Sequence, residues 1–149
     1  MSRQNAMRRQ RGMTLIELMI VVVIVAVLAS IALPSYRSYV LRTHRVEAKT
    51  ALLNLAAAQE KFYLENNTYA ANSVLATAPP AGLGLQATTE NGWYTVVIAN
   101  GANAANFSAT ATAAGAQVND TDCATFSITA LGVKTATKQG GAASTACWD

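Results

Sequence analysis

The chain has 149 residues, of which 52% are hydrophobic and only 13% are charged, about half the charged fraction of roughly 25% in soluble globular proteins. With two cysteines and nine glycines, this composition excludes a disordered chain, a disulfide-dense mini-protein and a collagen-like repeat. Four of the eleven basic residues lie among the first twelve positions, which contain no acidic residue, and residues 13–149 carry seven basic and eight acidic side chains. The formal charge of +3 therefore comes from the N-terminal segment and does not indicate nucleic-acid binding by the rest of the protein.

Residues 13–33 are the dominant feature of the sequence, because 18 of these 21 residues are apolar and the exceptions are Thr14, Glu17 and Ser30. As a helix the segment spans about 30 Å, the thickness of a bilayer core, whereas core helices of soluble proteins rarely run this long without a polar face. The segment is either a secretory signal peptide with a cleavage site near Ala32 or a retained anchor. Glu17 favours the anchor, because a carboxylate in an apolar segment costs free energy and by default marks a functional site.

Residues 10–18 read Gln-Arg-Gly-Met-Thr-Leu-Ile-Glu-Leu. This pattern resembles the class III signal of type IV pilins and pseudopilins, in which a short basic leader and a glycine precede an apolar run that usually begins Phe-Thr-Leu-Ile-Glu. Met13 stands here where phenylalanine is commonest. The similarity continues at residues 34–36, 58–63 and 66–69. The last of these stretches is similar to minor pilins of the pilin E kind, and the resemblance is strong over residues 8–70 and weaker beyond them.

The resemblance implies that residues 1–12 are a basic leader, which prepilin peptidase removes between Gly12 and Met13 on the cytoplasmic side. The same enzyme would methylate the new amine of Met13. Residues 13–34 would first hold the protein in the lipid bilayer of the inner membrane and later pack in the core of a filament. The implied partners are other pilin subunits, the peptidase and an inner-membrane assembly platform.

The resemblance also gives Glu17 a role in assembly, facing the terminal amine of a neighbouring subunit. A lone carboxylate buried among helices needs a partner, and such a pair would fix the register between chains. Within one chain Met13 and Glu17 are four residues apart, so a contact inside the chain is the alternative.

A helical pattern resumes directly after Pro34 and runs to about residue 66, so a helix kink is predicted at Pro34. Residues 35–66 are the amphipathic second half of the same helix, and their apolar stripe is predicted to pack on a sheet. The stripe comprises Val46, Leu53 and Ala57, is widened by Leu52 and Leu55, and ends with Phe62 or Tyr63. The opposite face carries Arg45, Lys49 and Glu60.

Residues 67–149 are predicted to form a connector loop, an antiparallel sheet and a C-terminal region closed by a disulfide. The strands are predicted from β-branched and aromatic residues at 93–99, 107–112, 123–130 and 133–137. Leu131 and Gly132 form the turn of a hairpin between the last two strands. Three or four strands against one long helix make an α+β fold, pilin-like in the light of the resemblance.

Cys123 and Cys147 are the two cysteines of the chain and are predicted to form one disulfide, which requires an oxidising compartment. The basic residues that flank the apolar segment are equal in number on its two sides, so the positive-inside rule alone does not orient it. The disulfide places the N-terminus in the cytoplasm and the C-terminal region in the periplasm or outside the cell.

Chemistry for catalysis is not recognisable in the sequence, and we expect no enzyme activity, no cofactor and no metal. His44 is the single histidine and is interpreted as a solvated residue of the helix surface. Asp120 and Asp122 both lie close to the first cysteine, Cys123, and are interpreted as part of a solvated turn rather than as a cation site.

The sequence is therefore interpreted as a structural subunit of a type IV pilus, of the minor, pilin E-like kind, serving twitching motility, adhesion or DNA uptake. A pseudopilin of a type II secretion machine is the nearest alternative, against which the two C-terminal cysteines weigh. An alternative of another class is a tip pilin that captures DNA or acts as an adhesin. Lys134 and Lys138 are its only basic candidates near the C-terminal loop, so DNA is not expected as a partner.

Processing gives the first testable prediction. The intact mass of the protein from its native host should show the loss of residues 1–12 and one added methyl group on Met13, because Gly12, Met13 and Glu17 have the spacing of the leader motif. A mature chain that begins at Leu33 would instead establish an ordinary secretory signal peptide.

Overall fold

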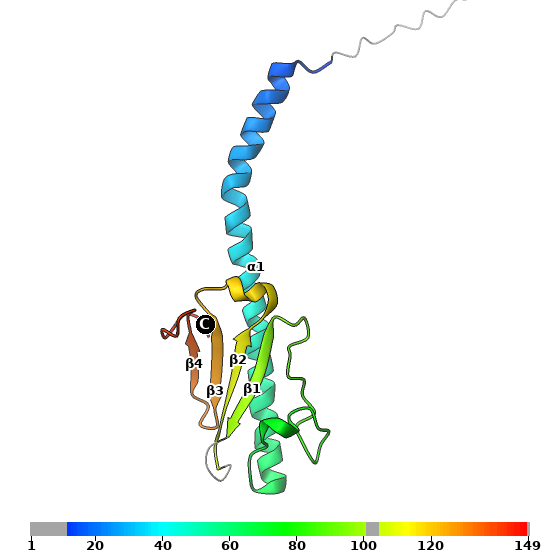
Figure 1. Cartoon of the computed structure of the whole chain (residues 1–149), viewed down its shortest axis with the longest axis vertical. Coiled ribbons are helices and arrows are strands. Elements are labelled where there is room, and N and C mark those ends of the chain that lie inside the picture. The colour runs from blue at the N-terminus through cyan, green and yellow to red at the C-terminus, as the bar shows by residue number, and fades with distance from the viewer. Residues whose placement is uncertain (1–11, 101–104, 149) are drawn as a thin grey trace, which may run out of the picture. The chain divides into compact units, whose positions relative to one another are not determined.

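The computed structural model describes residues 12–100 and 105–148, so most of the predicted leader lies outside the described residues. Its elements in chain order are α1 (Leu15–Asn66), η1 (Asn72–Val74), β1 (Tyr94–Asn100), β2 (Phe107–Ala113), η3 (Gly115–Asn119), β3 (Thr125–Thr129) and β4 (Lys134–Thr137). The chain divides into two units, Met1–Arg37 and Ser38–Asp149, and α1 passes through both. Figure 1 shows the second half of α1 lying along the sheet in the larger unit.

Helix α1 is a single helix of 52 residues. It continues through Pro34, and the kink predicted there stays a prediction. At its C-terminal end Asn67 adopts a left-handed conformation with φ of 56° and donates its N–H to the carbonyl of Tyr63 at 2.8 Å. This is the termination expected when asparagine takes the position that glycine usually occupies after a helix.

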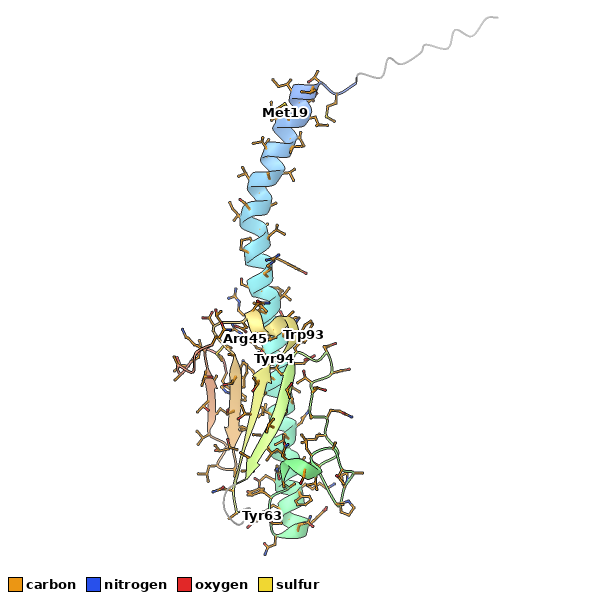
Figure 2. All side chains as sticks on the ribbon, viewed as in Figure 1. Met19, Arg45, Tyr63, Trp93 and Tyr94 are labelled. Carbon is orange, nitrogen blue, oxygen red and sulfur yellow. A yellow bond between two sulfur atoms is a disulfide. The ribbon has the colours of Figure 1, made fainter. Side chains whose placement is uncertain are left out.

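The smaller unit exposes the apolar half of α1. The large apolar side chains of residues 15–33 are between 50% and 77% exposed, and Figure 2 shows side chains projecting from this stretch of the ribbon on all sides. It is long and apolar enough to cross a membrane, although a signal sequence would pass the same test. An apolar surface of this size is unstable in water and has to be covered by lipid or by other protein.

The larger unit contains a four-stranded antiparallel sheet in the order β1-β2-β3-β4, which confirms the predicted architecture. The strand bounds differ from the prediction mainly in β3, which begins at Thr125 rather than at Cys123. The predicted hairpin turn joins β3 to β4, where Gly132 has a φ of 74° and donates its N–H to the carbonyl of Thr129. Alternate side chains face the core, and these include Val96, Phe107 and Phe126.

The face that α1 turns toward the sheet is only in part the predicted one. The residues that it buries are Ala48, Leu52, Leu55 and Gln59. Leu52 and Leu55 of the predicted stripe are confirmed as buried, whereas Val46 and Leu53 were wrong, because they are 58% and 44% exposed. A polar residue can occupy the core face because the amide of Gln59 bonds both the N–H and the carbonyl of Ala70, at 2.8 and 2.9 Å.

The buried face of α1 gives a second prediction, which compares two adjacent leucines. Leu52→Ala should lower the free energy of unfolding by about 2–5 kcal/mol, because Leu52 is fully buried and the change leaves a cavity. Leu53→Ala should lower it by less than about 1 kcal/mol, because that side chain is already 44% exposed. Urea unfolding of the purified chain measures both, and equal losses would contradict the described orientation of the helix.

Candidate assembly site

The first turn of α1 brings Thr14 and Glu17 together. The backbone N–H of Thr14 donates to Oε2 of Glu17 at 3.5 Å, and the N–H of Glu17 donates to the hydroxyl oxygen of Thr14 at 3.3 Å. This reciprocal pair is a capping box, which satisfies two of the backbone donors that a helix start leaves without partners. The carboxylate therefore has a partner within its own chain, which the sequence reasoning did not foresee in this form.

The capping box gives Glu17 a role that needs no second subunit. Unpaired backbone N–H groups are costly in lipid, where no water can replace the missing bonds, and the side chain of Glu17 supplies one of the acceptors. Gly12 and Met13 come directly before this turn and are both exposed, so the predicted cleavage bond is accessible. The pairing of Glu17 with a neighbouring amine stays a prediction.

A second cluster fastens the other half of α1 to the sheet domain. Arg45 donates from Nε and from its terminal amino group to the two carboxylate oxygens of Asp120, at 2.7 and 2.8 Å. The Asp120 side chain is 2% exposed and that of Arg45 15%, so the interpretation of Asp120 as part of a solvated turn was wrong. The sequence also predicted that Arg45 lies on the face of the helix opposite to the sheet domain. This prediction was wrong, because Arg45 binds Asp120 of that domain. The hydrogen bond to Asp120 raises the pKa of Arg45, so the guanidinium stays charged.

The carboxylate of Asp120 is the centre of this cluster. Besides Arg45 it accepts the backbone N–H of Cys123 at 3.2 Å and the side-chain amide of Gln117 at 3.0 Å. Gln117 is completely buried and also donates to the phenol of Tyr94 at 3.0 Å. Burial raises the pKa of Tyr94 strongly, so the phenol stays neutral and can accept this bond. Arg45 of α1, Gln117 of η3 and the backbone of Cys123 thus meet around one carboxylate, and β1 is joined to this cluster through Tyr94 and Gln117.

His44 belongs to the same cluster, although the sequence analysis placed it in solvent. Its ring stacks on Trp93 with 4.2 Å between the centroids and 8° between the planes. Its Nδ1 lies 3.0 Å from the amide oxygen of Gln117, and since that oxygen can only accept, Nδ1 donates. Figure 2 labels Arg45, Trp93 and Tyr94, which come from the helix and from the start of β1. The histidine is a packing residue between the helix and the sheet.

The C-terminal segment is held by the predicted disulfide between Cys123 and Cys147, whose Cα atoms are 5.8 Å apart. Both cysteines are 1% exposed. The segment then covers the edge of β4, where Ser144 donates its N–H to Ala136 and the indole of Trp148 donates to Thr135 at 2.7 Å. An edge strand covered in this way does not pair readily with other chains.

The lysines considered for DNA binding lie at this same edge. Nζ of Lys134 is 5.4 Å from the ring centroid of Trp148, and Lys138 is 4.0 Å from the exposed carboxylate of Asp122. Within the described ranges, 12–100 and 105–148, no three His, Cys, Asp or Glu side chains are grouped so as to hold a metal ion.

The aspartates near the disulfide give a third prediction. Asp120→Ala should lower the free energy of unfolding by about 3–5 kcal/mol, because it leaves a largely buried guanidinium and the backbone N–H of Cys123 without an acceptor. Asp122→Ala is the matched control and should change it by less than about 0.5 kcal/mol, because its side chain is 70% exposed. Urea unfolding of both variants tests this, and a small loss for Asp120→Ala would show that the ion pair does not fasten the helix.

Two family models match the chain. The model described as type IV minor pilin ComP, DNA uptake sequence receptor, matches residues 34–127, which is more than half of the chain. The model of the prokaryotic N-terminal methylation motif matches residues 7–33. The two matches meet at the junction between residues 33 and 34 and together cover the apolar helix, its amphipathic continuation and most of the sheet.

Individual relatives agree with these models. The fimbrial protein EcpC of Eikenella corrodens is 40% identical over 118 residues, which cover 72% of this chain and 69% of that protein. The type IV major pilin proteins PilA of Myxococcus xanthus and PilE1 of Neisseria gonorrhoeae are 49% and 38% identical over 61 and 94 residues. These matches take in 41% and 62% of this chain but only 28% and 41% of the two relatives.

Among solved structures, that of a type IV pilin from Shewanella oneidensis is 26% identical and aligns over 63% of this chain and 89% of its own, with a TM-score of 0.47. The minor-pilin model, the methylation motif and the similarity to EcpC identify this chain as a member of the type IV pilin family.

Proposed function

We propose that this chain is a structural subunit of a type IV pilus, held in the inner membrane until it is assembled. The observation that carries the proposal is the apolar half of α1, which the folded domain leaves exposed over residues 15–33. Lipid covers this surface in the stored state, and other pilin subunits cover it in the filament, because both environments remove it from water. The apolar half thereby serves as anchor and as filament core in turn.

Processing precedes assembly in this proposal. Prepilin peptidase cleaves between Gly12 and Met13, methylates Met13, and leaves a chain with its N-terminus on the cytoplasmic side and its disulfide-closed domain in the periplasm. The match to the methylation motif and the exposure of Gly12 and Met13 support this step. An inner-membrane platform then moves the subunit into the filament. In the same proposal the helix is kinked at Pro34.

The family matches favour a minor pilus subunit over a secretion pseudopilin. The matching domain model describes a minor pilin, and the relatives with the matches described above are pilus or fimbrial proteins. The disulfide between Cys123 and Cys147 points the same way, as the sequence suggested.

Glu17 is proposed to act twice. In the stored chain its carboxylate closes the capping box with Thr14, and in the filament the charge meets the terminal amine of a neighbouring subunit. The two roles place different demands on the side chain, because capping needs only an oxygen acceptor whereas pairing with an amine gains from a negative charge.

Two substitutions separate these roles and give the fourth prediction. Glu17→Val removes both acceptor and charge, while Glu17→Gln keeps an acceptor for the N–H of Thr14 and removes only the charge. Both variants should be cleaved and stay in the membrane, and both should be scarce in sheared filaments, because a buried amine without its partner costs about 3–5 kcal/mol. The ratio of filament to membrane protein on immunoblots measures the effect.

The contrast between the variants decides the role of Glu17. Normal assembly of Glu17→Gln together with loss of Glu17→Val would assign the residue to capping alone. Normal assembly of both, in a host without a wild-type copy, would show that Glu17 has no role in assembly.

DNA capture is the second candidate function, and one observation favours it: the matching domain model is described as a DNA uptake sequence receptor. The charges of this chain do not support strong binding. Residues 13–149 carry one acidic side chain more than basic ones, Arg45 is paired with Asp120, and Lys138 lies near Asp122. A surface with few free cations gives weak binding with a shallow salt dependence.

Measured affinity tests this fifth prediction. The mature chain in detergent should bind duplex DNA only weakly at physiological salt, and Lys134→Ala with Lys138→Ala should change the affinity little. Submicromolar binding that disappears in this double variant would overturn the expectation and establish a DNA-capturing pilin.

A further inference from the structure

The second half of α1 has an apolar face that its own sheet does not cover. Tyr39, Val46 and Leu53 are 65%, 58% and 44% exposed. They alternate with smaller exposed side chains along one line of the helix, which we call the outer seam. The outer seam consists of Tyr39, Thr43, Val46, Thr50, Leu53 and Ala57.

The geometry of the outer seam is that of a helix-pairing surface. Its residues are separated by four, three, four, three and four positions, the a and d spacing of a heptad repeat. At 3.6 residues per turn the outer seam lies about 170° around the helix from the residues that contact the sheet. The hydroxyl of Thr43 donates to the carbonyl of Tyr39 at 3.1 Å, so this threonine can turn its methyl group outward.

Lipid does not reach the outer seam in the stored state. The apolar segment of residues 13–33 already equals the thickness of a bilayer core, about 30 Å, and the outer seam begins six residues after it. Within residues 12–100 and 105–148, each of the six seam residues remains exposed. The stored subunit therefore presents tyrosine, valine and leucine to water just outside the membrane.

We propose that membrane-stored subunits pair in parallel through the outer seam, so that a second copy of this chain covers it. The proposal rests on the proposed function in one respect, namely that α1 anchors the chain in a bilayer. Anchors of the same orientation hold the helices parallel and raise their local concentration, so a short seam that would be too weak in solution can pair. The outer seam also continues, on the same helix, the exposed apolar residues 15–33 that the proposed function places against other subunits.

A charge at the end of the outer seam limits the length of the pair. Glu47, at a flanking position, is engaged within its own chain, because its Oε1 accepts the backbone and side-chain N–H groups of Asn91 and its Oε2 is buried. Glu60 occupies the next d position, where two copies would place like charges against each other. The pair therefore extends from Tyr39 to Ala57 and ends there.

Cross-linking in vesicles tests the pairing. Full-length chains with Val46→Cys or Leu53→Cys are placed in phosphatidylethanolamine and phosphatidylglycerol vesicles at low protein density and oxidised briefly. Leu131→Cys is the matched control, because Leu131 is a leucine 90% exposed at the β3–β4 turn. The two seam variants should give several-fold more disulfide-linked dimer than the control. Equal yields at the three positions would overturn the proposal.

A charge placed in the outer seam provides the second measurement. Adding Leu53→Glu to the Val46→Cys chain should reduce its dimer yield several-fold, with little change in thermal unfolding because Leu53 is exposed. Asn54→Glu adds the same charge one residue away, at an exposed flanking position, and should leave the yield unchanged. Equal yields in the two charge variants would also overturn the pairing.

The filament assay on Glu17 is independent of the vesicle experiment. If Glu17→Val loses filaments and the seam variants do not cross-link, the pairing is overturned and the proposed function stands.

Discussion

One helix carries more apolar surface than one small domain can bury, and this constraint governs the rest of the structure. The sheet covers a single face of the second half of α1, through Ala48, Leu52, Leu55 and Gln59. Residues 15–33 are left without cover over their whole circumference. A soluble monomer with this exposure would aggregate, so this surface has to be covered by lipid or by other protein.

The same constraint explains why a polar cluster fastens the helix to its domain. The core is thin, since Ala48, Ala109, Ala111 and Ala136 all belong to it, and alanine buries little area. The bidentate pair between Arg45 and Asp120 adds directional contacts, and Asp120 also binds the backbone beside the disulfide. The helix, η3 and the C-terminal segment therefore depend on a common carboxylate, and loosening any one of them disturbs the others.

The parts of this structure that local patterns determine could be predicted from the sequence. The strands follow β-branched and aromatic runs. The buried face of α1 could be predicted only in part. Leu52 and Leu55 are buried as expected, but Leu53 is just as apolar and lies on another side of the helix. A tertiary contact with Ala70 makes Gln59 a core residue. The partner of Asp120 is 75 residues away in the chain, so no local signal distinguishes this carboxylate from a solvated one.

The most direct test is whether water reaches the apolar half of α1, either in the membrane or in the assembled filament. A cysteine introduced as Val22→Cys, where the isolated chain exposes 57% of the side chain, can be treated with a water-soluble maleimide in membranes and in sheared filaments. Leu131→Cys supplies the reference for an exposed site. The account predicts that the cysteine at position 22 stays unlabelled in both preparations while the reference reacts in both. Labelling at position 22 in filaments, at the rate of the reference, would contradict it.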